Sequence, residues 1–205
     1  MRILSPIIAA LLVPLTIMSA PPRAHDHAHH DPALETAKPP SGNSIYNLDS
    51  TWTTQDGVAA TIGTLRGKPA IVAMAYTTCK DMCPAIVADM LWIEKHLPHE
   101  AAGVRLALFS FDSVLDTPER LKSYAEDHGL EPGRWTLFHG DEDAVRELAA
   151  ALGVRYRSDG KGGFDHATVI TLLDADGTIV FQQKGTEASP EELLRKLKSL
   201  VAERY

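Results

Sequence analysis

The 205-residue chain has little positive charge, because 20 Lys and Arg residues stand against 27 Asp and Glu residues. This balance argues against a basic face for nucleic acid, and we expect no nucleic-acid partner. Cysteine is scarce as well, and the two residues present confine any thiol chemistry to one stretch. The glycines of residues 160–163 are not followed by Gly-Lys-Ser/Thr, which argues against a phosphate-binding loop. With 44% hydrophobic residues, the chain has room for one well-cored domain.

Residues 1–24 are predicted to be an export signal. Arg2 precedes an apolar segment, residues 3–18, that is shorter than the roughly 20 residues of a membrane-spanning helix and ends near small residues. Cleavage after Ala20 or Ala24 fits this pattern, and an uncleaved N-terminal membrane anchor is the alternative. Both predict an exported domain, periplasmic or anchored at the outer face of the inner membrane, in an oxidising compartment.

Residues 25–44 read as a linker, because they are rich in proline and show no apolar period. The histidines within it are candidates for an auxiliary metal site, since neutral imidazole suits Cu(II) and Zn(II). A solvated polar spacer is the alternative interpretation. If cleavage follows Ala24, the mature chain begins His-Asp-His, and its free amine could join the third-residue imidazole around Cu(II) or Ni(II). These candidates are His25, His27, His29 and His30.

Residues 45–205 show the alternation of strands and helices that is typical of an α/β domain. The pattern predicts a central mixed β-sheet flanked by helices. Capping residues and glycines mark the helix starts and ends. The predicted strands are residues 70–76, 104–111 and 135–138, with hairpins at 46–57 and 168–182, and the predicted helices are 85–96, 117–128, 141–152 and a last one from Ser189.

Cys79 and Cys83 lie between a buried strand and the helix that follows it. Two thiols at this spacing can close a disulfide or bind one soft metal ion, and the spacing alone leaves both chemistries open. Thiolates select Cu(I) among the common metals, and imidazole serves either valence of copper. The carboxyl end of a strand is also where α/β sheets place their ligands.

The cysteine loop and two later segments of the chain resemble those of a known family. Residues 78–84, Thr-Cys-Lys-Asp-Met-Cys-Pro, resemble the T-x-C-P-x-x-C-P loop of the Sco/SenC proteins, thioredoxin-like copper chaperones of cytochrome c oxidase assembly. Residues 111–121 and the pair Asp165-His166 resemble later landmarks of that family, and the likeness spans roughly residues 45–203. Lys80 stands where the family usually has proline, and Ala167 stands where a hydroxyl residue is common.

The resemblance implies a thioredoxin-like fold and a copper site made of Cys79, Cys83 and His166. His166 is far from the thiols in sequence, so only the fold can bring it to them. We expect residues 158–165 to form a mobile glycine-rich loop that swings the imidazole onto the sulfurs. Asp112 is a candidate to orient one of the metal ligands without binding the metal itself, and a helix-entry turn is its alternative role.

Three function classes follow. The first is a metallochaperone that delivers copper to a cuproprotein such as an oxidase copper subunit, by binding Cu(I), Cu(II) or both. The second is a thiol:disulfide reductase that acts on the cysteines of a cuproprotein target and draws on a thiol reductant, with Cys79 attacking first. The third is a copper sensor or buffer without turnover. The dithiol would be catalytic only in the second class.

Overall fold

The computed structural model describes residues 42–79, 83–160, 162–185 and 188–202. The predicted export signal and the histidines His25, His27, His29 and His30 lie outside the described residues. Within the described part, no helix combines the length and the apolar character needed to cross a bilayer.

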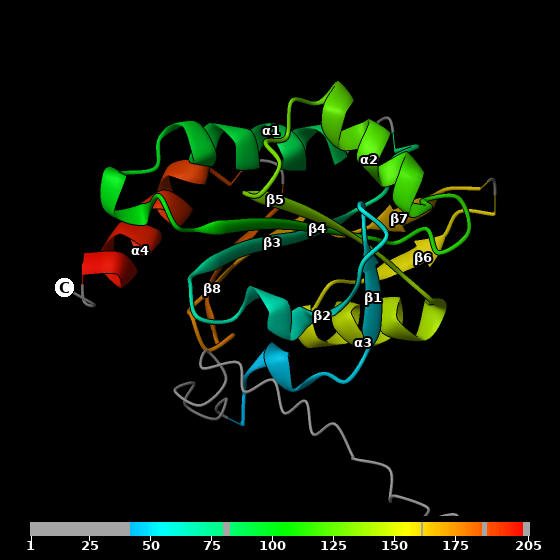
Figure 1. Ribbon diagram of the computed structural model, residues 1–205, viewed down its shortest axis with the longest axis horizontal. Coiled ribbons are helices and arrows are strands. Elements are labelled where there is room, and N and C mark those ends of the chain that lie inside the picture. The colour runs from blue at the N-terminus through cyan, green and yellow to red at the C-terminus, as the bar shows by residue number, and fades with distance from the viewer. Residues whose placement is uncertain (1–41, 80–82, 161, 186–187, 203–205) are drawn as a thin grey trace, which may run out of the picture. The chain divides into compact units, whose positions relative to one another are not determined.

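A mixed β-sheet forms the centre of the described domain, with the strand order β2-β1-β5-β4-β3-β8-β9 (Figure 1). Strands β3, β4 and β5 run parallel, and the remaining pairs are antiparallel. The mixed sheet predicted from the sequence is therefore confirmed. The strands are β1 Thr51–Thr54, β2 Ala59–Thr61, β3 Ala70–Ala75, β4 Arg105–Ser110, β5 Trp135–Gly140, β8 Val169–Leu173 and β9 Ile179–Lys184.

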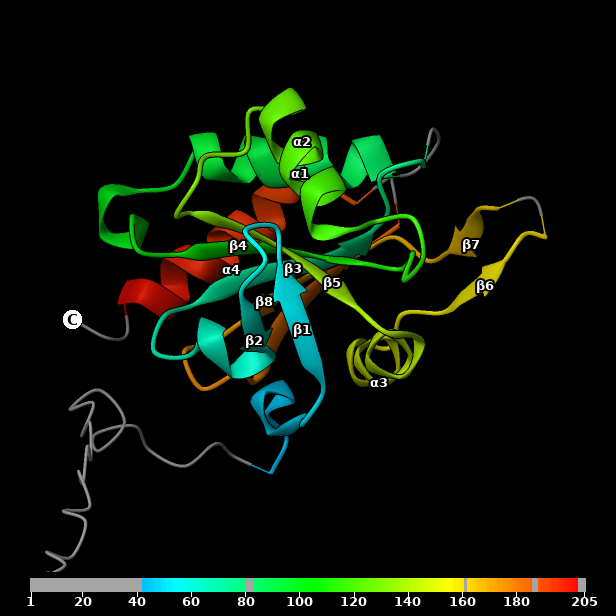
Figure 2. The ribbon, with the colours of Figure 1, turned by 45° about the vertical axis from the view of Figure 1, so that its right-hand side comes forward.

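Helices cover both faces of this sheet, which explains why its central strands are apolar throughout. All six residues of β3 are buried; Ile71 and Ala73 pack on one face, while Val72 and Met74 pack on the other. Figure 2 shows α1 and α2 on one side of the sheet and α3 on the other. The first face packs against α1 Cys83–Lys95, α2 Pro118–Asp127 and α4 Pro190–Ala202, and the second against α3 Glu142–Leu152, η1 Ile45–Asn47 and η2 Ile62–Leu65.

Helix ends follow the capping signals in the sequence. Thr117 caps α2, since its side chain accepts a hydrogen bond from the Arg120 amide. Asp141 caps α3 in the same way, and Gly153 ends that helix in the left-handed conformation, at φ 65°.

Two expectations differ from the structure. Residues 45–47 form a short 3-10 helix capped by Ser44, so the first strand begins only at Thr51. Of residues 158–165, expected as a mobile loop, Ser158, Phe164 and Asp165 lie in a two-stranded sheet of β6 Tyr156–Ser158 and β7 Phe164–His166, and the described residues between them connect the two strands. Strands of three residues are too short to show a period of two, so the sequence pattern did not reveal them.

Candidate metal centre

The dithiol turn follows the carboxyl end of β3, as predicted. Cys79 is half-buried, and Cys83 is fully buried as the first residue of α1. No disulfide joins Cys79 and Cys83 in the structure. The amide of Cys83 donates a hydrogen bond to Cys79 Sγ over 3.3 Å, so the helix start directs an N–H group at the first sulfur.

His166, the last residue of β7, completes a three-donor cluster. Its Nε2 lies 3.4 Å from Cys83 Sγ. The donor atoms of Cys79, Cys83 and His166 all lie within 4.8 Å of one another. Three bonds of roughly 2.0–2.3 Å at trigonal or tetrahedral angles place their donor atoms about 3.5–4.0 Å apart, so a contraction of at most about 1 Å would seat one ion among the three donors.

The backbone beside His166 sets the tautomer of its imidazole. Nδ1 lies 3.2 Å from the carbonyl oxygen of Ala167, which can only accept a hydrogen bond. Nδ1 therefore carries the proton, and the lone pair of Nε2 faces the thiols. The ring also packs against Phe111, with centroids 4.8 Å apart. Because the partner is a backbone carbonyl, the alanine at position 167 does not weaken this arrangement.

Burial favours the uncharged forms of two of the three donors, Cys83 and His166. It raises the pKa of the Cys83 thiol, and the neighbouring Cys79 and Asp116 add to that effect. Burial also lowers the pKa of His166, against the smaller opposing effects of the Ala167 carbonyl and Asp165. Near neutral pH Cys83 is thus a neutral thiol and His166 is a neutral imidazole. A soft metal ion would have to displace the thiol proton on binding.

Asp112 lies in the turn after β4, and its hydrogen bonds form that turn. Its Oδ1 accepts from the amides of Val114 and Leu115, over 3.0 and 2.8 Å. Among the described residues, none of its hydrogen bonds reaches Cys79, Cys83 or His166. This geometry fits the helix-entry role of Asp112, and orientation of a ligand stays a prediction for this residue.

Asp116 is the carboxylate that supports the dithiol turn, a role that was not predicted from the sequence. It is fully buried and accepts from the Thr77 amide at 3.0 Å, from the Thr77 hydroxyl at 2.5 Å and from the Ser110 hydroxyl at 2.6 Å. Thr77 in turn accepts from Arg120 Nε at 2.7 Å. In the sequence Asp116 reads as part of a helix start, so no local signal shows its long-range contacts.

Comparison with known proteins places the chain in a family. A family model described as SCO1/SenC matches residues 39–202. The chain belongs to the SCO1/SenC family. The SCO1 protein homolog of Bacillus subtilis is 26% identical over 153 residues, which are 73% of this chain and 79% of that protein. The resemblance stated from the cysteine loop is thereby confirmed.

Solved structures of SCO1/SenC proteins share the fold. ScoI of Bradyrhizobium japonicum, whose structure has copper bound, is 27% identical with a TM-score of 0.62, over 74% of this chain and 96% of that one. A SCO1/SenC family lipoprotein of Bacillus anthracis is 25% identical with a TM-score of 0.68, over 76% of this chain and 95% of that one. The predicted thioredoxin-like fold is confirmed.

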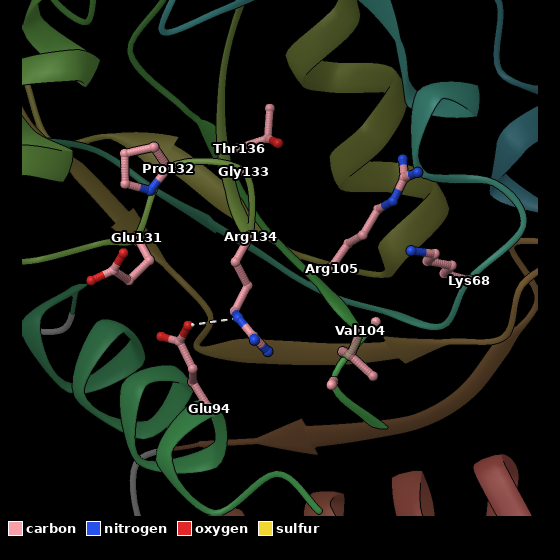
Figure 3. A pocket seen from close by; sticks show the side chains of 11 residues that line it. Lys68, Glu94, Val104, Arg105, Glu131, Pro132, Gly133, Arg134 and Thr136 are labelled. Atoms are coloured by element: carbon pink, nitrogen blue, oxygen red, sulfur yellow. Dashed lines mark ion pairs between the residues drawn. The ribbon is translucent and has the colours of Figure 1, made fainter. Parts of the chain in front are cut away.

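This SCO1/SenC domain also has a polar hollow of about 710 Å³ (Figure 3). It lies near the starts of the parallel strands β3, β4 and β5, whereas the dithiol turn follows the end of β3. Arg134 and Glu94 face each other across it in an ion pair of 3.2 Å. Glu94 also accepts from Trp135 Nε1 over 2.8 Å, which ties α1 to β5. The hollow contains neither thiol, and three of its charged residues, Glu94, Arg105 and Arg134, bond to other elements.

Proposed function

We propose that this SCO1/SenC protein binds copper through Cys79, Cys83 and His166 and delivers it to a cuproprotein such as an oxidase copper subunit. The 3.4 Å approach of His166 Nε2 to Cys83 Sγ carries the proposal. It joins residues 83 positions apart into one donor set, which neither a structural nor a purely redox dithiol needs. The copper found in the B. japonicum relative supports the choice of metal.

The donor chemistry fits a metal that is cargo. Thiolates favour Cu(I), and the imidazole is a good ligand for Cu(I) and Cu(II), so the set can hold copper in either valence. Three protein ligands leave a coordination position for a ligand of the acceptor. Cys79 and His166 are only partly buried, so an incoming protein can reach the ion from their side.

The proposal includes export, with residues 1–24 as a signal peptide or membrane anchor and residues 25–44 as a linker to the domain of residues 45–205. In an oxidising compartment Cys79 and Cys83 would form a disulfide, so copper loading would require a thiol reductant. N-terminal sequencing of the protein purified from its own cells tests this. A mature start near residue 21 or 25 supports cleavage, and Met1 supports the anchor.

Anaerobic Cu(I) titration against a competing chelator tests the copper site. The wild type should bind one Cu(I) at this site, Cys79→Ser and Cys83→Ser should lose at least about 100-fold in affinity, and His166→Ala about tenfold, since each removes a metal ligand. All five proteins, the control below included, should carry alanine at the linker histidines, so that the linker does not bind the probe. His99→Ala is the matched control, because His99 is an exposed histidine in η3 His99–Ala101.

An affinity of His166→Ala equal to that of the wild type would overturn the three-ligand site. In that case the thiols alone would hold the ion. The His99→Ala control separates this outcome from a general effect of removing a histidine.

The second candidate is a thiol:disulfide reductase, favoured by the hydrogen bond from the Cys83 amide to Cys79 Sγ. The Cys79 thiolate would attack a target disulfide and release one target thiolate, which takes up a proton. Cys83, after losing its proton, would then attack Cys79 and release the second target thiolate, which is also protonated. The protein ends as a disulfide, and a thiol reductant must restore it. Here His166→Ala should leave target reduction almost unchanged, whereas copper delivery should fall.

The linker histidines His25, His27, His29 and His30 are proposed as an auxiliary site for Cu(II) or Zn(II). Cu(II) titration of the full chain, compared with a variant that has alanine at these four positions, tests this role. Loss of one weaker equivalent in the variant supports it, and identical isotherms would leave the segment as a spacer.

A further inference from the structure

We propose that Tyr76 is a positioning residue of the copper site, a latch that holds strand β7 so that His166 stays within reach of the two thiols. The inference rests on the proposed copper site. It adds a residue that binds no metal itself and acts through the strand that carries the imidazole.

The phenol of Tyr76 forms a two-way tie with the backbone of Phe164. Its oxygen accepts from the Phe164 amide over 3.1 Å and lies 3.3 Å from the Phe164 carbonyl oxygen, to which the hydroxyl donates. Tyr76 directly follows β3, and Phe164 begins β7 two residues before His166. One side chain thus joins the segment that carries the thiols to the strand that carries the imidazole.

Glycine at position 163 allows this close approach. A Cβ at Gly163 would lie 3.2 Å from the Tyr76 hydroxyl oxygen and 2.8 Å from Asp159 Oδ2. The Tyr76 ring also packs edge-on against the ring of Phe164, with centroids 5.3 Å apart, and against His166 at 6.0 Å. The phenol interacts with Cys79 as well, so the latch lies between both parts of the site.

The hairpin needs such a tie because it is not part of the central sheet. Strands β6 and β7 pair with each other in a sheet of two strands, outside the central sheet. A two-stranded hairpin has marginal stability alone in water. Its orientation over the thiols therefore depends on contacts such as the Tyr76 latch, and the position of His166 depends on that orientation.

A double-mutant cycle tests the latch. Tyr76→Phe removes the hydroxyl and keeps the ring, so Cu(I) affinity should fall about threefold, less than the loss expected for His166→Ala, because copper binding must then order the hairpin. In a His166→Ala background the same change should have a clearly smaller effect, because the latch acts through His166 and only the interaction of the phenol with Cys79 is then lost. The control is Tyr156→Phe on β6, since Tyr156 packs on Phe111 at 5.0 Å and its hydroxyl has no hydrogen-bond partner among the described residues.

Two further measurements separate positioning from a general structural effect. In the metal-free protein, amide hydrogen exchange at Phe164 should speed up at least tenfold in Tyr76→Phe and stay unchanged in Tyr156→Phe. In the Cu(II) form, the nitrogen hyperfine signal of the imidazole should weaken in Tyr76→Phe alone.

The latch is overturned if Tyr76→Phe keeps wild-type exchange at Phe164, or if it lowers Cu(I) affinity equally with and without His166. Failure of the proposed function looks different, because then the wild type itself would not bind copper at this site. The exchange experiment needs no metal, so it tests the tie between Tyr76 and Phe164 in either case.

Discussion

At the scale of single residues, Asp116 does more for the metal centre than its place in the sequence indicates. It brings a fully buried carboxylate to the segment just before Cys79, where it satisfies the amide and hydroxyl of Thr77 and the hydroxyl of Ser110. Buried donors that lose their partner cost about 1–3 kcal/mol each. Asp116 therefore fixes the path of the chain into the dithiol turn.

Asp116→Ala should lower the free energy of unfolding by about 3 kcal/mol, because it leaves the buried Ser110 hydroxyl and the partly buried donors of Thr77 without this acceptor. Urea unfolding of the metal-free protein measures the change. Asp143→Ala is the control, since its side chain is 87% exposed and its ion pair with Arg146 should contribute less than about 0.5 kcal/mol. A similar loss in both variants would refute the supporting role of Asp116.

At the scale of elements, the β6–β7 hairpin is the part on which the site depends most. Phe111, at the end of β4, is buried and packs against the His166 ring at 4.8 Å and the Tyr156 ring at 5.0 Å. The central sheet thus provides an aromatic platform for the hairpin.

Phe111→Ala should destabilise the protein by about 3–4 kcal/mol and also lower Cu(I) affinity, because the hairpin loses its platform. Phe138→Ala is a matched control: Phe138 is also buried and stacks on Phe109 at 4.5 Å, on the face that packs against α3. It should cost similar stability and leave Cu(I) affinity unchanged. Equal affinities of the two variants would show that the platform does not position His166.

At the scale of the whole molecule, the burial of His166 makes the free energy of unfolding depend on pH. Burial lowers the pKa of His166, so the folded metal-free protein favours the neutral imidazole. In the unfolded chain His166 takes up a proton as the pH falls through roughly 6.5, whereas in the folded protein it does so only at a lower pH. The contribution of His166 is thus complete above that pH and is lost as the pH falls toward the lower pKa of the folded state.

Between pH 8 and pH 5, the metal-free wild type should therefore lose more stability than His166→Ala. Urea unfolding at several pH values gives both curves, with exposed His99→Ala as the control that should follow the wild type. A constant difference between the wild type and His166→Ala over this range would contradict the coupling.

The sequence determined the alternation of elements and most of their positions. Local patterns predict the buried strand before the thiols and the helices capped by Thr117 and Asp141, because burial period and capping act over a few residues. They also single out Cys79 and Cys83 as donors. The resemblance to a family extended this to His166.

Only the tertiary structure decided how the donors meet. It placed Nε2 of His166 beside Cys83, put Asp116 beneath the turn, and tied Phe164 to Tyr76 across 88 positions of the chain. It also paired the two ends of the expected loop as strands of a hairpin. These contacts join segments that are far apart in the sequence. They depend on shape and hydrogen-bond geometry that exist only after packing, so a local sequence pattern cannot predict them.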